Sequence, residues 1–238
     1  MTLLLFREDA YLTESTATVT GITDRGGVVL DTSLFYPTGG GQPGDGGRLA
    51  WGGTSMQVVT TVKADGDDIA LIPPEGAELP RIGTQVTQHI DWDRRYAHMR
   101  VHTALHLLSV VVPLPVTGGA ISEGQGRLDF AMPEPPADPK AIEDQLNALI
   151  ARDLEVSESW ITDAELAANP DLVKTMSVQP PSGAGHVRLV RIGQGDDQVD
   201  LQPCGGTHVA KTAEIGHVTL TKIENKGKQN RRVKIRLD

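Results

Sequence analysis

Two pairs of residues in this sequence have the chemistry of metal ligands. His102 and His106 are four positions apart, and Cys204 and His208 repeat that spacing much later in the chain. A helix places residues four apart on one face, so two imidazoles at this spacing can bind one ion. Thiolate and imidazole ligands together suit a borderline-soft cation. The four residues therefore predict one tetrahedral site per chain, for which Zn²⁺ is the favoured metal.

Each pair alone has an ordinary structural explanation. Histidines four apart occur in packed cores, and a single cysteine in an intracellular protein is commonly buried and unreactive. Cys204 is the only cysteine, which excludes an internal disulfide. The occurrence of both pairs in one chain favours the metal site. The helix lacks the glutamate of an HExxH motif, which argues against a zinc peptidase. His98 would lie about 6 Å along the axis from His102, so we expect it outside the ligand set.

Helical patterns surround the histidine pair. Asp91 or Asp93 can cap a helix that ends before Pro113, and its apolar residues recur at helical spacing. A second helix is expected over 139–154, and Thr162 with Glu165 is typical of a capping box. Strands are expected after residue 91 at 126–131, 186–192, 198–201, 217–223 and 232–237.

The first 90 residues have the pattern of a β-rich unit. Short apolar runs separated by Gly, Asp and Pro suggest a small barrel, and they lie at 17–22, 27–30, 56–62, 69–72 and 85–90. From residue 91 helices and strands mix without a βαβ repeat. We therefore expect an α+β protein with two domains. Residues 1–90 form a small N-terminal β-barrel, and residues 91–238 form an α+β domain with the zinc site.

A glycine-rich loop interrupts the predicted barrel at 35–47, with the sequence FYPTGGGQPGDGG. It has neither a Walker ending nor the helix that follows a dinucleotide fingerprint. Glycines permit close backbone approach to a ligand, and successive amides can bind phosphate or carboxylate. A sharp connection between strands is the structural alternative. Gly40, Gln42 and Asp45 are the candidate ligand contacts in this loop.

Composition and charge limit the classes of function. The net charge of −9 argues against a protein that coats nucleic acid. The C-terminal segment is nevertheless basic, and with Arg94, Arg95 and Arg100 it can form a phosphate-binding rim. Its cations are Lys222, Lys226, Lys228, Arg231, Arg232, Lys234 and Arg236. A charged edge strand is the equal alternative. The N-terminal apolar run is too short for a signal peptide, so a cytoplasmic protein is expected.

Three strings occur in order: FYPTGGGQPGDGG, RYAHMRVHTALHLLS and PCGGTHVAKTAEIGHV. Together they resemble the editing region of alanyl-tRNA synthetase and its freestanding relatives, the alanyl-tRNA editing (AlaX) proteins. The resemblance implies that His102, His106, Cys204 and His208 bind zinc. It also implies an amino-acid pocket along 115–130, where Thr117 and Ser122 are the polar residues. The chain begins at Met1 and ends soon after the editing motifs, from which we expect a trans-acting editor, assumed to be a monomer.

The resemblance implies a hydrolase that deacylates alanine tRNA carrying serine, with glycine as the second candidate amino acid. A pocket that hydrogen-bonds the serine hydroxyl would reject alanine, because alanine leaves those groups unpaired. Neither metal motif contains a carboxylate that serves as an obvious base. Two alternatives stay open: a structural-zinc RNA-binding module without activity, and a zinc hydrolase of another small ester.

Overall fold

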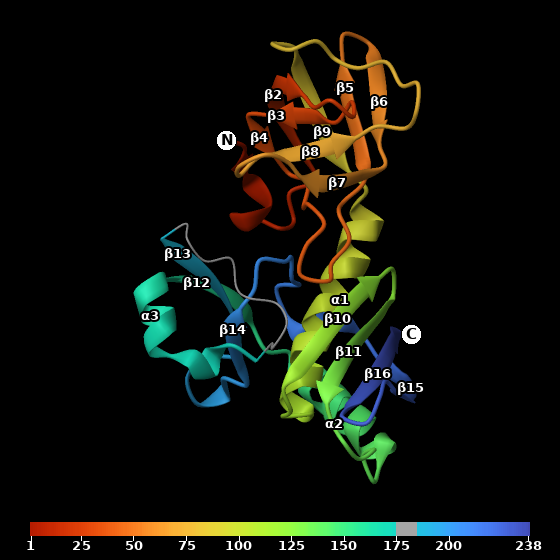
Figure 1. The fold of residues 1–238 in the computed structure, drawn as a ribbon, viewed down its shortest axis with the longest axis vertical. Helices are drawn as coiled ribbons and strands as arrows, with labels where there is room; N and C mark the ends of the chain where they lie inside the picture. The colour runs from red at the N-terminus through yellow and green to blue at the C-terminus, as the bar shows by residue number, and fades with distance from the viewer. Residues whose placement is uncertain (175–184) are drawn as a thin grey trace. The chain divides into compact units, whose positions relative to one another are not determined.

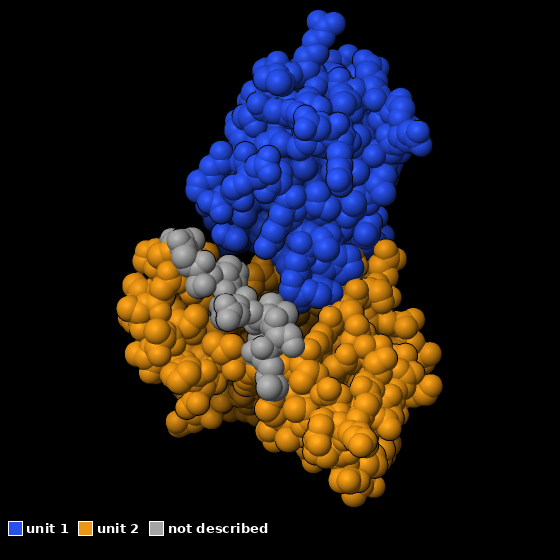
Figure 2. All heavy atoms as spheres, in the orientation of Figure 1, with its two compact units in different colours: residues 1–96 blue, residues 97–238 orange. Residues whose placement is uncertain are grey.

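The computed structural model describes residues 1–174 and 185–238. The chain divides into two compact units, residues 1–96 and residues 97–238, which Figure 2 colours separately. Strands predominate over helices in both units, and the expected mixture of α and β structure is confirmed. We expected the boundary between the two domains to follow Ile90, and that domain boundary stays a prediction.

Unit 1, residues 1–96, is built on one seven-stranded sheet with the order β6-β5-β9-β2-β3-β8-β7. The sheet ends at β6 and β7, and these two strands do not pair with each other within residues 1–96. The small closed barrel that we expected is therefore not confirmed. The strands are β2 Glu14–Ile22, β3 Val28–Leu30, β5 Gly47–Trp51, β6 Thr54–Val58, β7 Thr60–Lys63, β8 Ile69–Ile72 and β9 Gln85–Ile90. A separate two-stranded sheet pairs β1 Leu3–Leu4 with β4 Thr32–Ser33, and the 3₁₀ turn Leu5–Arg7 directly follows β1.

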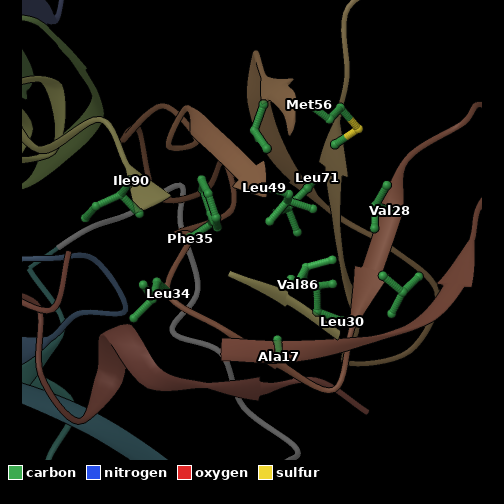
Figure 3. Close-up of a cluster of buried hydrophobic side chains, with 12 residues drawn as sticks. Ala17, Val28, Leu30, Leu34, Phe35, Leu49, Met56, Leu71, Val86 and Ile90 are labelled. Atoms are coloured by element: carbon green, nitrogen blue, oxygen red, sulfur yellow. The ribbon is translucent and has the colours of Figure 1, made fainter. Parts of the chain in front are cut away.

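Buried side chains from these strands make the core of unit 1. Leu30, Leu49 and Leu71 are each no more than 1% exposed, and Figure 3 shows them beside Phe35 and Val86. Burial of a leucine side chain contributes about 1.5–3 kcal/mol, so this cluster supplies a large part of the stability of the unit. The expected run at 56–62 is two strands, because Val59 separates β6 from β7.

Helix α1, Trp92–Val111, begins in unit 1 and continues into unit 2. Asp91 begins it by accepting a hydrogen bond from the Arg94 amide at 3.3 Å. Pro113 lies just beyond its end, as expected from the sequence. The helix is buried on nearly every side from Ala97 onward, so the two histidines of its central turns lie inside the protein.

Helix α2, Pro139–Ala151, packs against one sheet of unit 2. Asp138 caps it by accepting from the Ala141 amide at 3.1 Å, and its buried residues are Leu146 and Ile150. The expected extension to residue 154 is wrong. The chain leaves the helix because Asp153 adopts a φ of 51°, which a right-handed helix does not allow.

Two sheets complete unit 2 (Figure 1). The four-stranded sheet has the order β10-β11-β16-β15, and the three-stranded sheet has the order β12-β13-β14. Gly126 on β11 lies against α1, since a Cβ there would come 2.5 Å from Val101 Cγ1. The strands are β10 Val116–Ser122, β11 Gln125–Ala131, β12 Val156–Thr162, β13 His186–Ile192, β14 Asp200–Pro203, β15 Val218–Asn225 and β16 Asn230–Leu237.

Short helices connect the strands of unit 2. The expected capping box is confirmed, because Thr162 and Glu165 make both reciprocal bonds at the start of α3, Asp163–Ala168. Single 3₁₀ turns lie at Pro170–Leu172, Gly195–Asp197 and Thr212–Ile215. Strand β14 begins at Asp200, two residues after the start that we expected at residue 198. Among residues 1–174 and 185–238, no helix has the length and apolar character to span a membrane.

Candidate metal centre

The two predicted ligand pairs meet inside unit 2. His102 and His106 come from successive turns of α1, and Cys204 and His208 come from the segment that follows β14. One ligand atom from each residue lies within 4.8 Å of all the others. Cys204 Sγ is 3.5 Å from His102 Nε2 and 3.3 Å from His208 Nε2. Residues separated by half the chain thus converge on one point.

These distances fit a tetrahedral zinc site. With Zn–S near 2.3 Å and Zn–N near 2.0–2.1 Å, a tetrahedral ion places sulfur and nitrogen about 3.5 Å apart. Both observed sulfur–nitrogen distances lie close to that value. The three imidazoles are between 5% and 8% exposed, so water competes little for the ligand atoms. The donor set of one thiolate and three imidazoles is also one that zinc prefers.

The unused nitrogen of each of two imidazoles has a partner of its own. Thr103 Oγ1 donates to Met99 O at 3.0 Å, so its oxygen accepts from His208 Nδ1 at 3.1 Å. Asp200 Oδ2 accepts from His106 Nδ1 at 2.9 Å. Both bonds place the proton on Nδ1 and direct the Nε2 lone pair toward the cluster. Backing of this kind is what a metal-binding histidine requires.

The turn that carries Cys204 is held by Arg188 of β13. One terminal nitrogen of its guanidinium donates to the carbonyl oxygens of Cys204 and Gly206, at 2.8 Å in each case. Glu158 of β12 pairs with the same guanidinium, with Oε2 2.7 Å from Nε. The bend does not require glycine at position 205, because Gly205 has no positive φ and a Cβ there would meet nothing within 4 Å. Hydrogen bonds from Arg188 therefore shape this turn.

The electrostatics of the cluster prepare it for a cation. Burial alone would raise the pKa of the Cys204 thiol, but His102 and His208 lie so close that the pKa falls well below its usual value. Burial lowers the pKa of His208 well below its usual range. Burial also acts to lower the pKa of His106, yet its bond to Asp200 prevails and raises that pKa to about 9. A thiolate and a neutral imidazole are the forms that would bind a metal, and His106 would have to release its proton to do so.

The glycine-rich loop lies in unit 1, between β4 and β5. Its tip is exposed at Gly40 and Gly41, where φ is 56° and 85°. Such values favour glycine over other residues. Gly44 marks the tightest approach in the loop, because a Cβ there would lie 2.0 Å from the carbonyl oxygen of Thr61. The exposed tip and the enclosed base of the loop therefore need glycine for different reasons.

Gln42 and Asp45 belong to this loop, but both are enclosed, with 1% of each residue exposed. The Asp45 carboxylate accepts from the Tyr36 amide at 2.6 Å and from Arg95 Nε at 2.9 Å. The predicted substrate contacts of Gln42 and Asp45 stay predictions. Arg95 is fully buried, so it does not lie on the surface where we expected a phosphate-binding residue.

The other predicted substrate residues lie on the four-stranded sheet. Thr117 Oγ1 donates to Asp129 O at 3.2 Å. Arg232 binds the Asp129 carboxylate through two bonds of 2.7 and 2.8 Å. Arg231 donates to the carbonyl oxygen of Pro133 at 2.6 Å. The structure thus gathers Thr117 and Arg232 at Asp129, and their contacts with RNA stay predictions.

Three residues that support the cluster were not predicted from the sequence: Thr103, Arg188 and Asp200. A signal existed for Asp200 alone. It precedes Cys204 by four positions, and strand alternation puts both on the same side of β14. His98, which we expected outside the ligand set, is not part of the cluster formed by the described residues, and it is 1% exposed.

Two protein-family models match the chain. Residues 187–234 match the model described as the threonyl and alanyl tRNA synthetase second additional domain. Residues 5–94 match the model described as tRNA synthetases class II (A). The first match includes Cys204 and His208, the second ligand pair of the cluster.

Several proteins are similar to this chain over almost its whole length. The alanyl-tRNA editing protein AlaX-M of Methanosarcina mazei is 36% identical over 243 residues, which cover 98% of this chain and 95% of that protein. The protein of the same name from Saccharolobus solfataricus is 34% identical, with 98% of each chain covered. The alanine–tRNA ligase of Pyrobaculum calidifontis is 35% identical over 92% of this chain, but the match covers only 25% of the ligase.

Proposed function

Since this chain belongs to the family of alanyl-tRNA editing proteins, we propose that it hydrolyses the ester bond that links a wrong amino acid to alanine tRNA. Serine is the first amino acid proposed, and glycine is the second. The observation that carries the proposal is the convergence of His102, His106, Cys204 and His208 within 4.8 Å. We propose that these four residues hold one Zn²⁺, and that the enzyme works in the cytoplasm.

The reaction adds water across an ester. The water oxygen bonds to the carbonyl carbon of the amino acid, the bond from that carbon to the ribose oxygen breaks, and the ribose oxygen takes up a proton. Bound zinc supplies charge that polarises a carbonyl or lowers the pKa of a water. The protein contributes orientation, because Thr103 and Asp200 fix two of the imidazoles. Asp200 is 3% exposed and already accepts bonds from three side chains, so it is not placed as a base toward substrate.

Discrimination is proposed to depend on the serine hydroxyl. A hydrolytic pocket with a group that bonds this hydroxyl leaves that group unpaired when alanine enters, which costs about 1–3 kcal/mol. Thr117 of β10 is the residue that we propose for this contact, beside the pair formed by Asp129 and Arg232. Glycine has no hydroxyl, so its hydrolysis would require a different basis for selection.

The tRNA is proposed to contact both units. Gly40 at the exposed loop tip can approach a backbone closely, since it has no side chain. We propose that Gln42 and Asp45 act through the shape of this loop, because both are enclosed. Arg231 and Arg232 of β16 are the proposed phosphate contacts, and their side chains leave the strand in opposite directions.

The test compares hydrolysis of Ser-tRNA(Ala), Gly-tRNA(Ala) and Ala-tRNA(Ala), with zinc quantified in the same preparation. We expect rapid loss of serine, with alanine spared. Folded, zinc-loaded protein that hydrolyses none of the three would contradict the proposal. A panel of small esters then tests whether a zinc hydrolase with another substrate is the better description.

One observation favours a second candidate, a structural-zinc module that binds RNA without hydrolysis. Four protein ligands close a tetrahedral site, whereas catalytic zinc commonly keeps one position for water or substrate. The cluster offers four ligands. Hydrolysis would then need a fifth position or the release of a ligand such as His208. The behaviour of the metal-free protein distinguishes the two functions.

A further inference from the structure

One buried carboxylate touches the ligand cluster without belonging to it. Asp200 of β14 is 3% exposed, and its Oδ2 accepts from His106 Nδ1 at 2.9 Å. The same oxygen accepts from Gln202 Nε2 at 2.7 Å. The other oxygen, Oδ1, accepts from Lys174 Nζ at 2.5 Å. Both oxygens are engaged, so the carboxylate has a fixed orientation toward the imidazole.

The strand geometry couples this carboxylate to the thiolate ligand. Residues two apart on a strand point to the same face, and the burial of β14 alternates accordingly at Asp200 and Gln202. Cys204 continues that series immediately after the strand. The segment that presents the Cys204 thiol thus also presents the group that orients His106. Any shift of β14 would move both.

Lys174 gives the carboxylate a permanent countercharge. A buried carboxylate without a cation is strongly disfavoured, and His106 must be neutral when it binds a metal. The Lys174 ammonium supplies a charge that does not depend on the state of His106, and its Nζ lies 2.5 Å from Asp200 Oδ1. Its backbone is anchored as well, because the Val116 amide donates to the carbonyl oxygen of Lys174 at 3.1 Å. The ion pair therefore connects β10 to the histidine ligand.

We propose that Asp200 is a positioning residue, which holds His106 with its proton on Nδ1 so that Nε2 faces the metal, while Lys174 compensates the carboxylate charge. The inference rests on the proposed function, since it takes the cluster as a zinc site. It adds a role for a residue outside the four ligands. Loss of a carboxylate that orients a histidine ligand typically lowers metal affinity by about 10–100-fold.

The test measures zinc affinity by competition with a chromophoric chelator. Asp200→Asn keeps the shape of the side chain and removes its charge, and we expect zinc to bind about 10–100-fold more weakly. The control is Glu143→Gln, because this carboxylate accepts from the Leu220 amide at 2.8 Å and has no contact with the ligands. Glu143→Gln should lower the melting temperature of the protein and leave its zinc affinity unchanged.

Thermal unfolding of each metal-free variant separates positioning from stability. An Asp200→Asn protein that binds zinc as tightly as the wild type would overturn the inference, whatever its melting temperature. If Asp200→Asn does not fold, Lys174→Met combined with Asp200→Asn removes both buried charges together, and the same fall in affinity is expected. Wild-type protein that binds no zinc would contradict the proposed function itself. Wild-type protein that binds zinc without hydrolysing the ester of Ser-tRNA(Ala) would contradict the proposed reaction alone.

Discussion

Arg95 and Asp45 form an ion pair that is completely enclosed, with Arg95 0% and Asp45 1% exposed. Arg95 Nε lies 2.9 Å from Asp45 Oδ2, and the guanidinium also donates to the carbonyl oxygens of Leu34 and Ala10. The pair joins the first turn of α1 to the base of the glycine-rich loop, both within unit 1. This ion pair therefore holds the base of the glycine-rich loop in place, although the tip of the loop is exposed.

Asp45→Asn is expected to destabilise the protein by about 3–5 kcal/mol, because it leaves the Arg95 charge buried without a countercharge. Chemical denaturation measures this free energy of unfolding. The double variant, Asp45→Asn with Arg95→Met, should cost less than the sum of the single changes. Asp24→Asn, at an exposed position, is the control and should change stability by less than about 0.5 kcal/mol. Additive effects would show that the pair is not coupled.

Cys204→Ala removes the only thiolate of the cluster. We expect bound zinc to fall below about one-tenth of the wild-type content, and deacylation to fall by at least about 100-fold. Metal analysis and hydrolysis of Ser-tRNA(Ala) are measured on the same preparation. Full activity with unchanged zinc would eliminate Cys204 as a ligand.

Arg188→Lys tests the support of the cysteine turn. Lysine lacks the fork that reaches Glu158 and the carbonyl oxygens of Cys204 and Gly206 together. We expect zinc to transfer to a chelator about tenfold faster than from the wild type. Arg191→Lys is the matched control on the same strand, because Arg191 contacts exposed Gln198 instead. Equal transfer rates for the two variants would remove Arg188 from the site.

Removal of zinc distinguishes catalysis from a structural role. Unit 2 has buried residues on both α1 and its sheets, among them Leu108, Phe130 and Val233. We therefore expect metal-free protein to keep its circular dichroism spectrum, to melt at a lower temperature, and to lose deacylation until zinc is restored. An unfolded metal-free protein would instead support the structural-zinc module.

Lys226 and Lys228 test RNA binding without disturbing the sheet, because both are exposed in the turn between β15 and β16. Reversal of Arg232 would also break its pair with Asp129. Replacing both lysines by glutamate should weaken tRNA binding. If each lysine makes one phosphate contact, the salt dependence should fall by about 1.4–1.8 in logarithmic slope. Lys140→Glu on α2 is the control, and an equal effect there would indicate nonspecific charge.

The sequence predicted strands and helices correctly where one clear local pattern marked where an element begins or ends. The cap at Asp91 and the stop before Pro113 bound α1, and Thr162 with Glu165 bounds α3. Strand β12 was missed because its exposed Trp160 and alternating polar residues give no apolar run. The sequence also did not decide whether the sheet of unit 1 closes into a barrel, since local patterns predict strands but not which strands pair.

The sequence by itself determined the candidate ligand residues and their spacing, because a helix places residues four apart on one side and the second pair has the same spacing. It also carried the motifs by which the family is recognised. Only the tertiary structure brought the two pairs within 4.8 Å, and only it placed Asp200 behind His106 and Arg188 behind Cys204. Those contacts join residues far apart in the chain, so no local pattern encodes them. They arise from the packing of α1 and the three-stranded sheet into one unit.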